Sequence, residues 1–174
     1  VRGNLAVTIT ATGTLQPTRS VAVGSELSGT VTRVLVDVND RVKKGQLLVE
    51  LDRAKLADAV SGARAELEAA RARRQQAEAT LKEARASAAR LDEVARLSGG
   101  KLPAAADLDA ARAAADRAAA DLASATASIA QATASLSTAE TSLAKAAIRS
   151  PIDGVVLARN VEPGNAVAAS LQAV

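Results

Sequence analysis

The stretch Ser98-Gly99-Gly100-Lys101-Leu102-Pro103 decides the fold, because it is the only strong helix stop between residues 53 and 147. Residues 53–97 are dominated by Ala, Arg, Glu, Leu and Gln, which are strong helix formers, and Gly62 is a tolerated exception. A second helix is expected from about residue 104 to about residue 147. Two long helices separated by so short a stop are predicted to fold back on each other as an antiparallel hairpin.

Apolar residues recur with a period of seven in both predicted helices, which is typical of a coiled coil. The seam of the second helix consists of Leu108, Ala111, Ala115, Ala118, Leu122, Ala125, Ile129, Ala132, Leu136, Ala139, Leu143 and Ala146. The seam of the first helix consists of Leu56, Val60, Ala63, Leu67, Ala70, Arg74, Ala77, Leu81, Ala84, Ala88, Leu91 and Ala95. An ordinary bundle of Ala-rich helices is the alternative interpretation.

The position of the stop predicts which residues meet across the hairpin. Folding at the glycines pairs residues whose numbers sum to about 202. Leu81 then faces Leu122 and Leu67 faces Leu136, and these four form the predicted coil core. Arg74 would face an apolar residue, so we expect its side chain to reach the edge of the seam and approach Glu78.

The composition excludes several classes of function. The chain has 174 residues, a formal net charge of +3, and no His, Cys, Phe, Tyr or Trp. Thiol chemistry, His-based catalysis and zinc sites are therefore not expected. Base stacking on aromatic rings is unavailable, and the basic residues lie among acidic ones along one helix, so no nucleic-acid partner is expected. The carboxylates have helix-surface spacing from Arg or Lys, and we predict neither an enzyme nor a bound cofactor or metal.

Short β segments flank the helical region, and the two flanks resemble each other. Before the helices, Leu5, Val7 and Ile9 alternate with polar residues, and valines separated by Gly and Asn/Asp turns follow. Gly29, Val31, Val36 and Val42 match Gly154, Val156, Val161 and Val167 at one constant spacing. This pattern favours a half-repeat whose copies close face to face into one small sandwich.

The flanks also resemble the two halves of a lipoyl or biotinyl domain. The first resemblance lies in residues 28–31 and 38–48, and the second lies in residues 148–156 and 163–167. In such carriers a tight turn with a modified lysine joins the halves, whereas here the predicted hairpin replaces that turn. Arg53 stands in the lysine's place in Leu51-Asp52-Arg53-Ala54, and a guanidinium is a poor acyl acceptor. An acyl-carrier domain and a stand-alone coiled-coil scaffold are the less favoured alternatives.

The order of these motifs resembles that of the membrane fusion proteins, or periplasmic adaptors, of tripartite efflux pumps. Arg2-Gly3-Asn4-Leu5 and residues 11–17 resemble the strand that begins their β-barrel domain, and residues 164–173 resemble adaptors of macrolide-type ABC exporters. The predicted fold class is α+β, with a long antiparallel two-helix coiled-coil hairpin inserted in a split lipoyl-like β-sandwich. The predicted parts are a β-barrel fragment (1–19), the first lipoyl-like half (20–52), the hairpin (53–147, turn at about 98–103), and the second half with an exit toward the barrel (148–174).

The resemblance implies an adaptor that links an inner-membrane transporter, of the ABC type, to an outer-membrane channel in a drug efflux or secretion pump. Adaptors of type I secretion or of proton-driven pumps are alternatives within the family. It also implies a ring-forming homo-oligomer, a hexamer, in the periplasm. The chain lacks an initial Met and any long apolar run, so we expect a processed or truncated product whose attachment to the inner membrane lies in a segment outside this chain.

The resemblance places partner docking at the hairpin tip. Adaptors that dock on TolC-like channels resemble one another there in an Arg, a Leu four residues on, and a Ser seven beyond. These positions are Glu93, Leu97 and Ala104 here, with Arg96 and Lys101 close by. We take these five residues as candidate docking residues, and a contact that only caps the helix end is the alternative role of Leu97.

Two further surfaces are candidates for contacts inside a ring. The second helix carries no charge from residue 122 to residue 139, so a neighbouring helix could approach it closely. A bland solvent-facing surface is the alternative there. The resemblance also suggests that the loop with Glu162 and Asn165 faces the lumen of the ring.

Overall fold

The computed structural model describes residues 8–13 and 18–169. Two long helices separate two groups of short strands, which confirms the predicted α+β class. The elements are β1 (Gly29–Val34), β2 (Arg41–Val42), β3 (Leu47–Leu51), α1 (Ala54–Leu97), α2 (Ala105–Lys145), β4 (Ala147–Arg149), β5 (Gly154–Val155) and β6 (Ala166–Val167).

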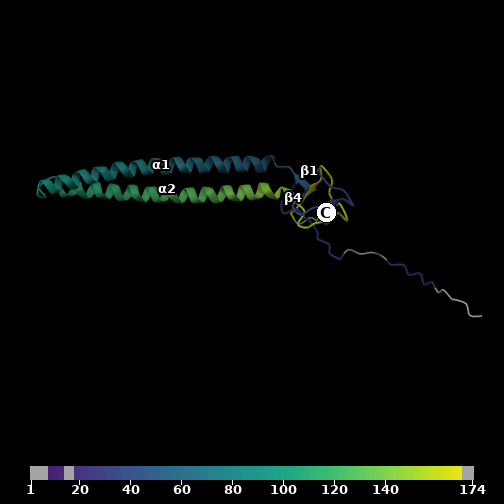
Figure 1. Cartoon of the computed structure of the whole chain (residues 1–174). Helices are drawn as coiled ribbons and strands as arrows, with labels where there is room; N and C mark the ends of the chain where they lie inside the picture. The colour runs from purple at the N-terminus through teal and green to yellow at the C-terminus, as the bar shows by residue number, and fades with distance from the viewer. Residues whose placement is uncertain (1–7, 14–17, 170–174) are drawn as a thin grey trace, which may run out of the picture.

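Helices α1 and α2 lie side by side and project from a small β-domain, with the turn between them at the far end (Figure 1). They contain 44 and 41 residues, so each is about 60–65 Å long. Two ion pairs join them, Arg64–Glu140 at 3.6 Å and Asp92–Arg112 at 2.6 Å. In both pairs the two residues lie equally far from Leu102 along the chain, as an antiparallel pair requires. Helix α2 ends at Lys145, slightly before the expected boundary, because Ala147 already pairs in β4.

The expected seams lie between the helices. Every seam residue is buried or partly buried except Arg74, whose guanidinium reaches the edge and pairs with Glu78 at 3.4 Å. Leu67, Ala70 and Ala132 form a buried cluster, and Ile129 and Leu136 pack against it. Because one helix faces only one other helix, the contact remains a narrow stripe, and most other helix positions are exposed.

The β-domain contains a four-stranded sheet in the order β4-β3-β1-β6 and a two-stranded sheet formed by β2 and β5. Strand β3 precedes α1 and strand β4 follows α2, and the two strands pair with each other. The helices therefore leave and re-enter the domain at neighbouring strands. The core consists of Val31, Val36, Val42, Leu48, Val49, Leu51, Ala146, Ile148, Val156, Val161 and Val167.

The constant spacing between the two flanks recurs in the strand pairing as a quasi-twofold relation. Gly29 pairs with Val167, and the equivalent residues Gly154 and Val42 pair with each other. The Val31 N–H donates to the Asn165 carbonyl at 2.9 Å, and the equivalent Val156 N–H donates to the Asp40 carbonyl at 3.0 Å. The six valines of the repeat meet in one core, because each half covers the apolar face of the other.

Two buried serines obey the same relation and were not singled out from the sequence. Ser25 and Ser150 are both buried, and each hydroxyl donates to the carbonyl two residues on, Leu27 and Ile152. Each buried hydroxyl thereby bonds to a carbonyl of its own turn.

Only part of the predicted N-terminal β-barrel fragment lies within the described residues. Leu5, Val7, Pro17 and the motif at residues 2–5 lie outside the described residues, as do residues 170–173 of the exit motif. Ile9 was expected in a strand, yet residues 8–13 form none and Ile9 is 87% exposed. A strand needs a partner for its backbone hydrogen bonds, and no described segment pairs with this one.

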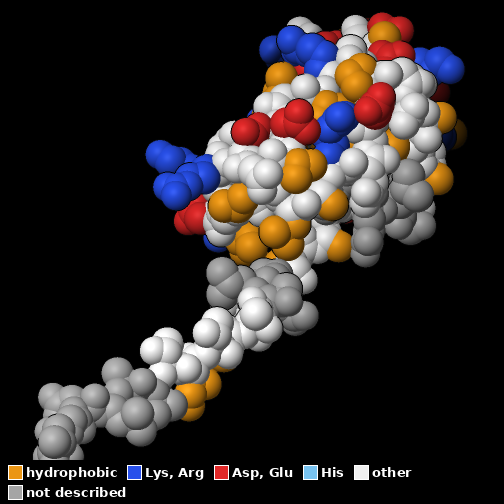
Figure 2. All heavy atoms as spheres, turned by 90° about the vertical axis from the view of Figure 1, so that its right-hand side faces the viewer, with side chains coloured by type: hydrophobic (Ala, Val, Ile, Leu, Met, Phe, Trp, Pro, Cys, Tyr) orange, Lys and Arg blue, Asp and Glu red, His pale blue; other side chains and the backbone are white. Residues whose placement is uncertain are grey.

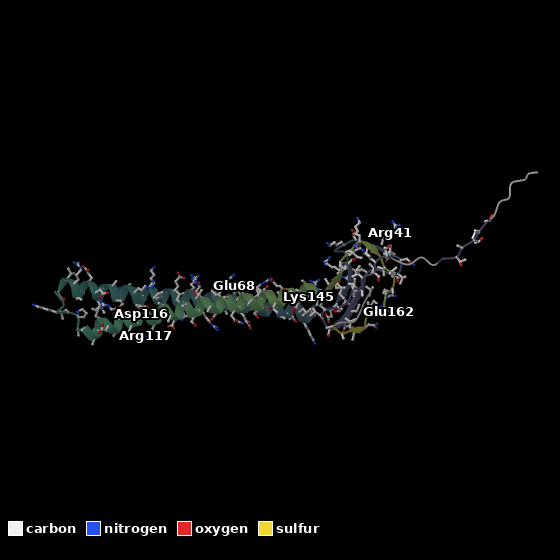
Figure 3. All side chains as sticks on the ribbon, turned by 90° about the horizontal axis from the view of Figure 1, so that it is seen from below. Arg41, Glu68, Asp116, Arg117, Lys145 and Glu162 are labelled. Carbon is white, nitrogen blue, oxygen red and sulfur yellow. The ribbon has the colours of Figure 1, made fainter. Side chains whose placement is uncertain are left out.

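Among the described residues, no helix combines the length and apolar character needed to cross a bilayer. No group of acidic side chains in this part of the chain is arranged to hold a metal ion. Charged side chains follow the outer surface of the helices and continue onto the β-domain, as Figure 3 shows for Glu68, Lys145 and Glu162.

Candidate functional site

The hairpin tip is built by a serine and two glycines. Helix α1 ends at Leu97, and Gly99 and Gly100 follow with φ of 62° and 81°, a conformation that favours glycine. The Gly100 N–H donates to the Ala95 carbonyl at 2.9 Å. The Ser98 hydroxyl donates to the Leu102 carbonyl at 2.7 Å and accepts from the Leu102 N–H at 3.0 Å. These bonds hold the turn closed before α2 begins.

Large apolar side chains are exposed at this tip. Val94 is 45% exposed, Leu97 71% and Leu102 62%. Elsewhere in the two helices, whose residues are all described, every Leu, Ile and Val is at least partly buried. The candidate residue Leu97 therefore does not cap the helix end by packing there, and its side chain is available for contact.

The charged candidates at the tip are engaged with each other. Arg96 and Glu93 form a two-point ion pair, with Nε to Oε2 at 2.9 Å. Hydrogen bonding from Arg96 lowers the pKa of Glu93 below its ordinary value, and Glu93 raises the pKa of Arg96. Lys101 is exposed and makes no ion pair with any described residue. Ala104 is exposed and is the N-cap residue that precedes α2, and its carbonyl accepts from the Asp107 N–H at 3.0 Å.

Sequence reasoning missed Val94, Ser98 and Leu102. Val94 lies outside the seam of α1, whose nearest members are Leu91 and Ala95. An apolar residue outside the seam is the sequence signal that could have identified it. Leu102 was counted only as part of the stop. The role of the Ser98 hydroxyl depends on the closed turn and has no sequence signal.

The four predicted coil-core residues lie along the interface of α1 and α2. Leu67 and Leu81 of α1 are buried, whereas Leu122 and Leu136 of α2 are partly buried. Leu67 and Leu136 belong to the same cluster. Helix α2 is therefore the more open of the two at these positions.

The uncharged part of α2 presents hydroxyls whose donors are already used. Four hydroxyls in this part donate to the carbonyl four residues earlier in the same helix. They belong to Thr126, Ser128, Thr133 and Thr138, and the hydroxyls of Thr141 and Ser142, just beyond this part, bond in the same way. Burying such a hydroxyl leaves its donor satisfied, so these side chains can be covered without new partners for their donors.

The loop between Val161 and Ala166 is tied to the β-domain. Glu162 is exposed, and its carboxylate lies 3.3 Å from the Arg159 guanidinium, which also lies 3.4 Å from Asp37. Asn165 is exposed, and its carbonyl accepts from Val31. Figure 3 shows Glu162 on the β-domain, away from the helices.

Arg53, which the resemblance to lipoyl domains aligns with the carrier lysine, forms an ion pair. The Arg53 guanidinium lies 3.4 Å from the Glu50 carboxylate, which also binds Arg33 at 2.6 Å. Hydrogen bonds from Arg33 and then Arg53 lower the pKa of Glu50 below its ordinary value. Arg53 is thus part of an ion-pair network at the base of α1.

Comparison with known proteins places this geometry in one family. Residues 19–174 match the family model described as RND MFP, barrel-sandwich hybrid domain. The chain is 38% identical over 109 residues to the macrolide export protein MacA of Escherichia coli O157:H7, and this alignment covers 63% of this chain and 29% of that protein. It is 51% identical over 51 residues to the pyoverdine export membrane fusion protein PvdR of Pseudomonas putida, covering 29% of this chain and 13% of that protein.

The solved structure of MacA from Actinobacillus actinomycetemcomitans superimposes with a TM-score of 0.80 at 29% identity. The match covers 88% of this chain and 46% of that one, so this chain spans less than half of the solved relative. The chain therefore belongs to the RND membrane fusion proteins, the adaptors of efflux and secretion systems, and resembles the adaptor of the macrolide exporter.

Proposed function

We propose that this chain is the part of a periplasmic adaptor that connects an inner-membrane transporter of the ABC type to an outer-membrane channel in a drug efflux or secretion pump. The split lipoyl-like halves form the base, and the hairpin spans toward the channel. In this proposal residues 1–19 begin the β-barrel domain, and the attachment to the inner membrane lies in a segment outside this chain. The likeness to MacA, a macrolide export protein, favours an ABC-type transporter.

One observation carries the docking part of this proposal. Leu97 ends α1, at the turn between the helices, and that turn lies at the end of the hairpin farthest from the β-domain (Figure 1). Leu97 and its neighbours Val94 and Leu102 are exposed, while the remaining large apolar side chains of both helices are buried or partly buried. Exposed apolar groups that are confined, within the two helices, to the tip indicate a contact surface. Glu93, Arg96, Lys101 and Ala104 surround this point and are its candidate rim.

The same proposal includes a ring of six copies of this chain around a central lumen. The charge-free surface of α2 supports it, because hydroxyls that are satisfied within their own helix can be buried against a neighbouring copy. The loop with Glu162 and Asn165 would then face the lumen. The two halves of the β-domain share one core, which gives the base a fixed shape. Docking at the tip and packing between neighbouring copies both depend on that shape.

The test of docking is a Leu97→Asp substitution in the complete adaptor. We expect binding to the TolC-like channel of the source organism to fall by about 100-fold or more, because a charge would be buried in an apolar contact. Gln75→Asp, an exposed change halfway along α1 and outside the charge-free surface of α2, is the control for docking and should retain channel binding. Unchanged affinity and unchanged drug export with Leu97→Asp would reject docking through the tip.

The type of transporter is tested separately by purifying the complete adaptor after chemical crosslinking in cells. Recovery of an ABC-type permease supports the proposal. Recovery of a proton-driven pump in its place would overturn that part and leave the adaptor function standing.

A further inference from the structure

Leu102 has an unusual environment for an exposed leucine. It lies in the turn, yet its N–H and its carbonyl both bond to the Ser98 hydroxyl, at 3.0 and 2.7 Å. The preceding Gly99 and Gly100 adopt positive φ, which only glycine accommodates readily. The backbone of Leu102 is therefore held at one place, although its side chain is 62% exposed.

A held apolar side chain is suited to binding. An exposed leucine in a free loop would lose conformational entropy on association, and a prearranged one loses less. Leu97 is the last residue of α1, immediately before Ser98, and is also exposed. The Ser98 hydroxyl thus connects the helix end that carries Leu97 to the turn that carries Leu102.

We propose that Leu102 is a second contact residue for the outer-membrane channel and that Ser98 is its positioning residue. This inference rests on the tip docking proposed above and extends it to residues outside the docking pattern of the family. The two leucines would enter an apolar cleft of the channel, and Ser98 would set the distance between them.

The charges at the tip favour a partner with carboxylates or carbonyl oxygens beside that cleft. Glu93 and Arg96 neutralise each other, while Lys101, next to Leu102, has no ion pair among the described residues. An ammonium at the rim would then find an acceptor on the partner. A second copy of this chain would instead bring two Lys101 groups together at a tip-to-tip contact.

The inference is tested by affinity measurements with the complete adaptor and the detergent-solubilised TolC-like channel of the source organism. We expect Leu102→Ala to weaken binding about tenfold and Ser98→Ala about three- to tenfold. Ser98→Thr keeps the hydroxyl and should restore affinity to within about twofold of the unaltered adaptor. In the Leu102→Ala background, Ser98→Ala should add less than about twofold, because a positioning residue has nothing left to position.

Two further readouts separate this inference from a general loss of structure and from the proposed function. Hydrogen exchange at the Leu102 amide should accelerate in Ser98→Ala, while circular dichroism retains its helical signal. Photo-crosslinking from position 102 should capture the channel. Capture of a second copy alone would overturn the inference.

Full affinity in Leu102→Ala and Ser98→Ala, combined with lost affinity in Leu97→Asp, would also overturn the inference and leave docking through Leu97 intact. If the unaltered adaptor fails to bind the channel, both the inference and the docking proposal are wrong.

Discussion

The two halves of the β-domain, residues 25–42 and 150–167, are equivalent inside and different outside. Their valines occupy matched places in one core, and their backbone hydrogen bonds repeat within 0.1 Å at matched positions. On the surface, Thr30 and Thr32 of the first half correspond to the exposed Val155 and Leu157 of the second. Hydrophobic side chains gather among charged ones on the end of the domain that faces away from the helices (Figure 2).

This difference teaches that the repeat is maintained by packing and not by surface chemistry. A buried position must fill the same volume in both halves, because each half forms the other's core. An exposed position meets only solvent or a partner, so the halves are free to differ there. Exchanging or weakening matched residues therefore tests how far the equivalence extends.

The largest expected effect comes from matched core valines. Val31→Ala and Val156→Ala should each lower the free energy of unfolding of the β-domain by about 2–3 kcal/mol, because both remove methyl groups from the same core. The chain has no Trp or Tyr for fluorescence, so hydrogen exchange of the β3 amides is the suitable measurement. Losses that differ by more than about 1 kcal/mol would show that the halves are not energetically equivalent.

The next effect concerns matched turn residues with positive φ, 73° at Asn39 and 91° at Gly164. Valine at either position should lower stability by about 1–2 kcal/mol, because a β-branched residue tolerates this conformation poorly. The exchange of Asn39→Gly with Gly164→Asn should change stability by less than about 0.5 kcal/mol, since both residues accept it. Equilibrium denaturation monitored by hydrogen exchange measures both, and a large loss in the exchanged variant would contradict the equivalence.

A smaller effect is expected at the buried serines. Ser25→Ala and Ser150→Ala each leave a turn carbonyl without its hydroxyl donor and should lower stability by about 1 kcal/mol. Ser128→Ala is the control, because that hydroxyl is exposed and bonds only within its own helix. A serine variant that behaves like the control would show that its half does not need the bond.

The smallest effect comes from the ion pair between Arg33 of the first half and Glu50 of β3, which has no counterpart in the second half because Arg33 is matched there by Ala158. Arg33→Gln should raise the pKa of Glu50 toward its ordinary value, because Arg33 is the main cause of the lowered pKa. A lowered folded-state pKa stabilises the fold above the unfolded-state pKa, and that contribution disappears as the pH falls through the folded-state value. Carboxyl NMR titration of both proteins measures the shift. Identical titration curves would rule out the network.

Several features could be predicted from the sequence because their causes are local. The run of helix formers, the stop at residues 98–103 and the period of seven determine two helices, their turn and their seam, since side-chain direction follows helix geometry. Arg74 was recognised as a misfit for the same reason. The valine repeat indicated its symmetry because buried positions constrain residue type in both halves.

Other features were decided only by the tertiary structure. Val94 and Leu102 look like any apolar residues until the closed hairpin leaves them without a covering surface, and the Ser98 hydroxyl gains its two bonds only when the turn brings Leu102 to it. Ser25 and Ser150 are polar residues that the sequence alone would place at the surface. Sequence patterns determine which face of an element is apolar, whereas burial and hydrogen-bond partners depend on which distant segments arrive beside it.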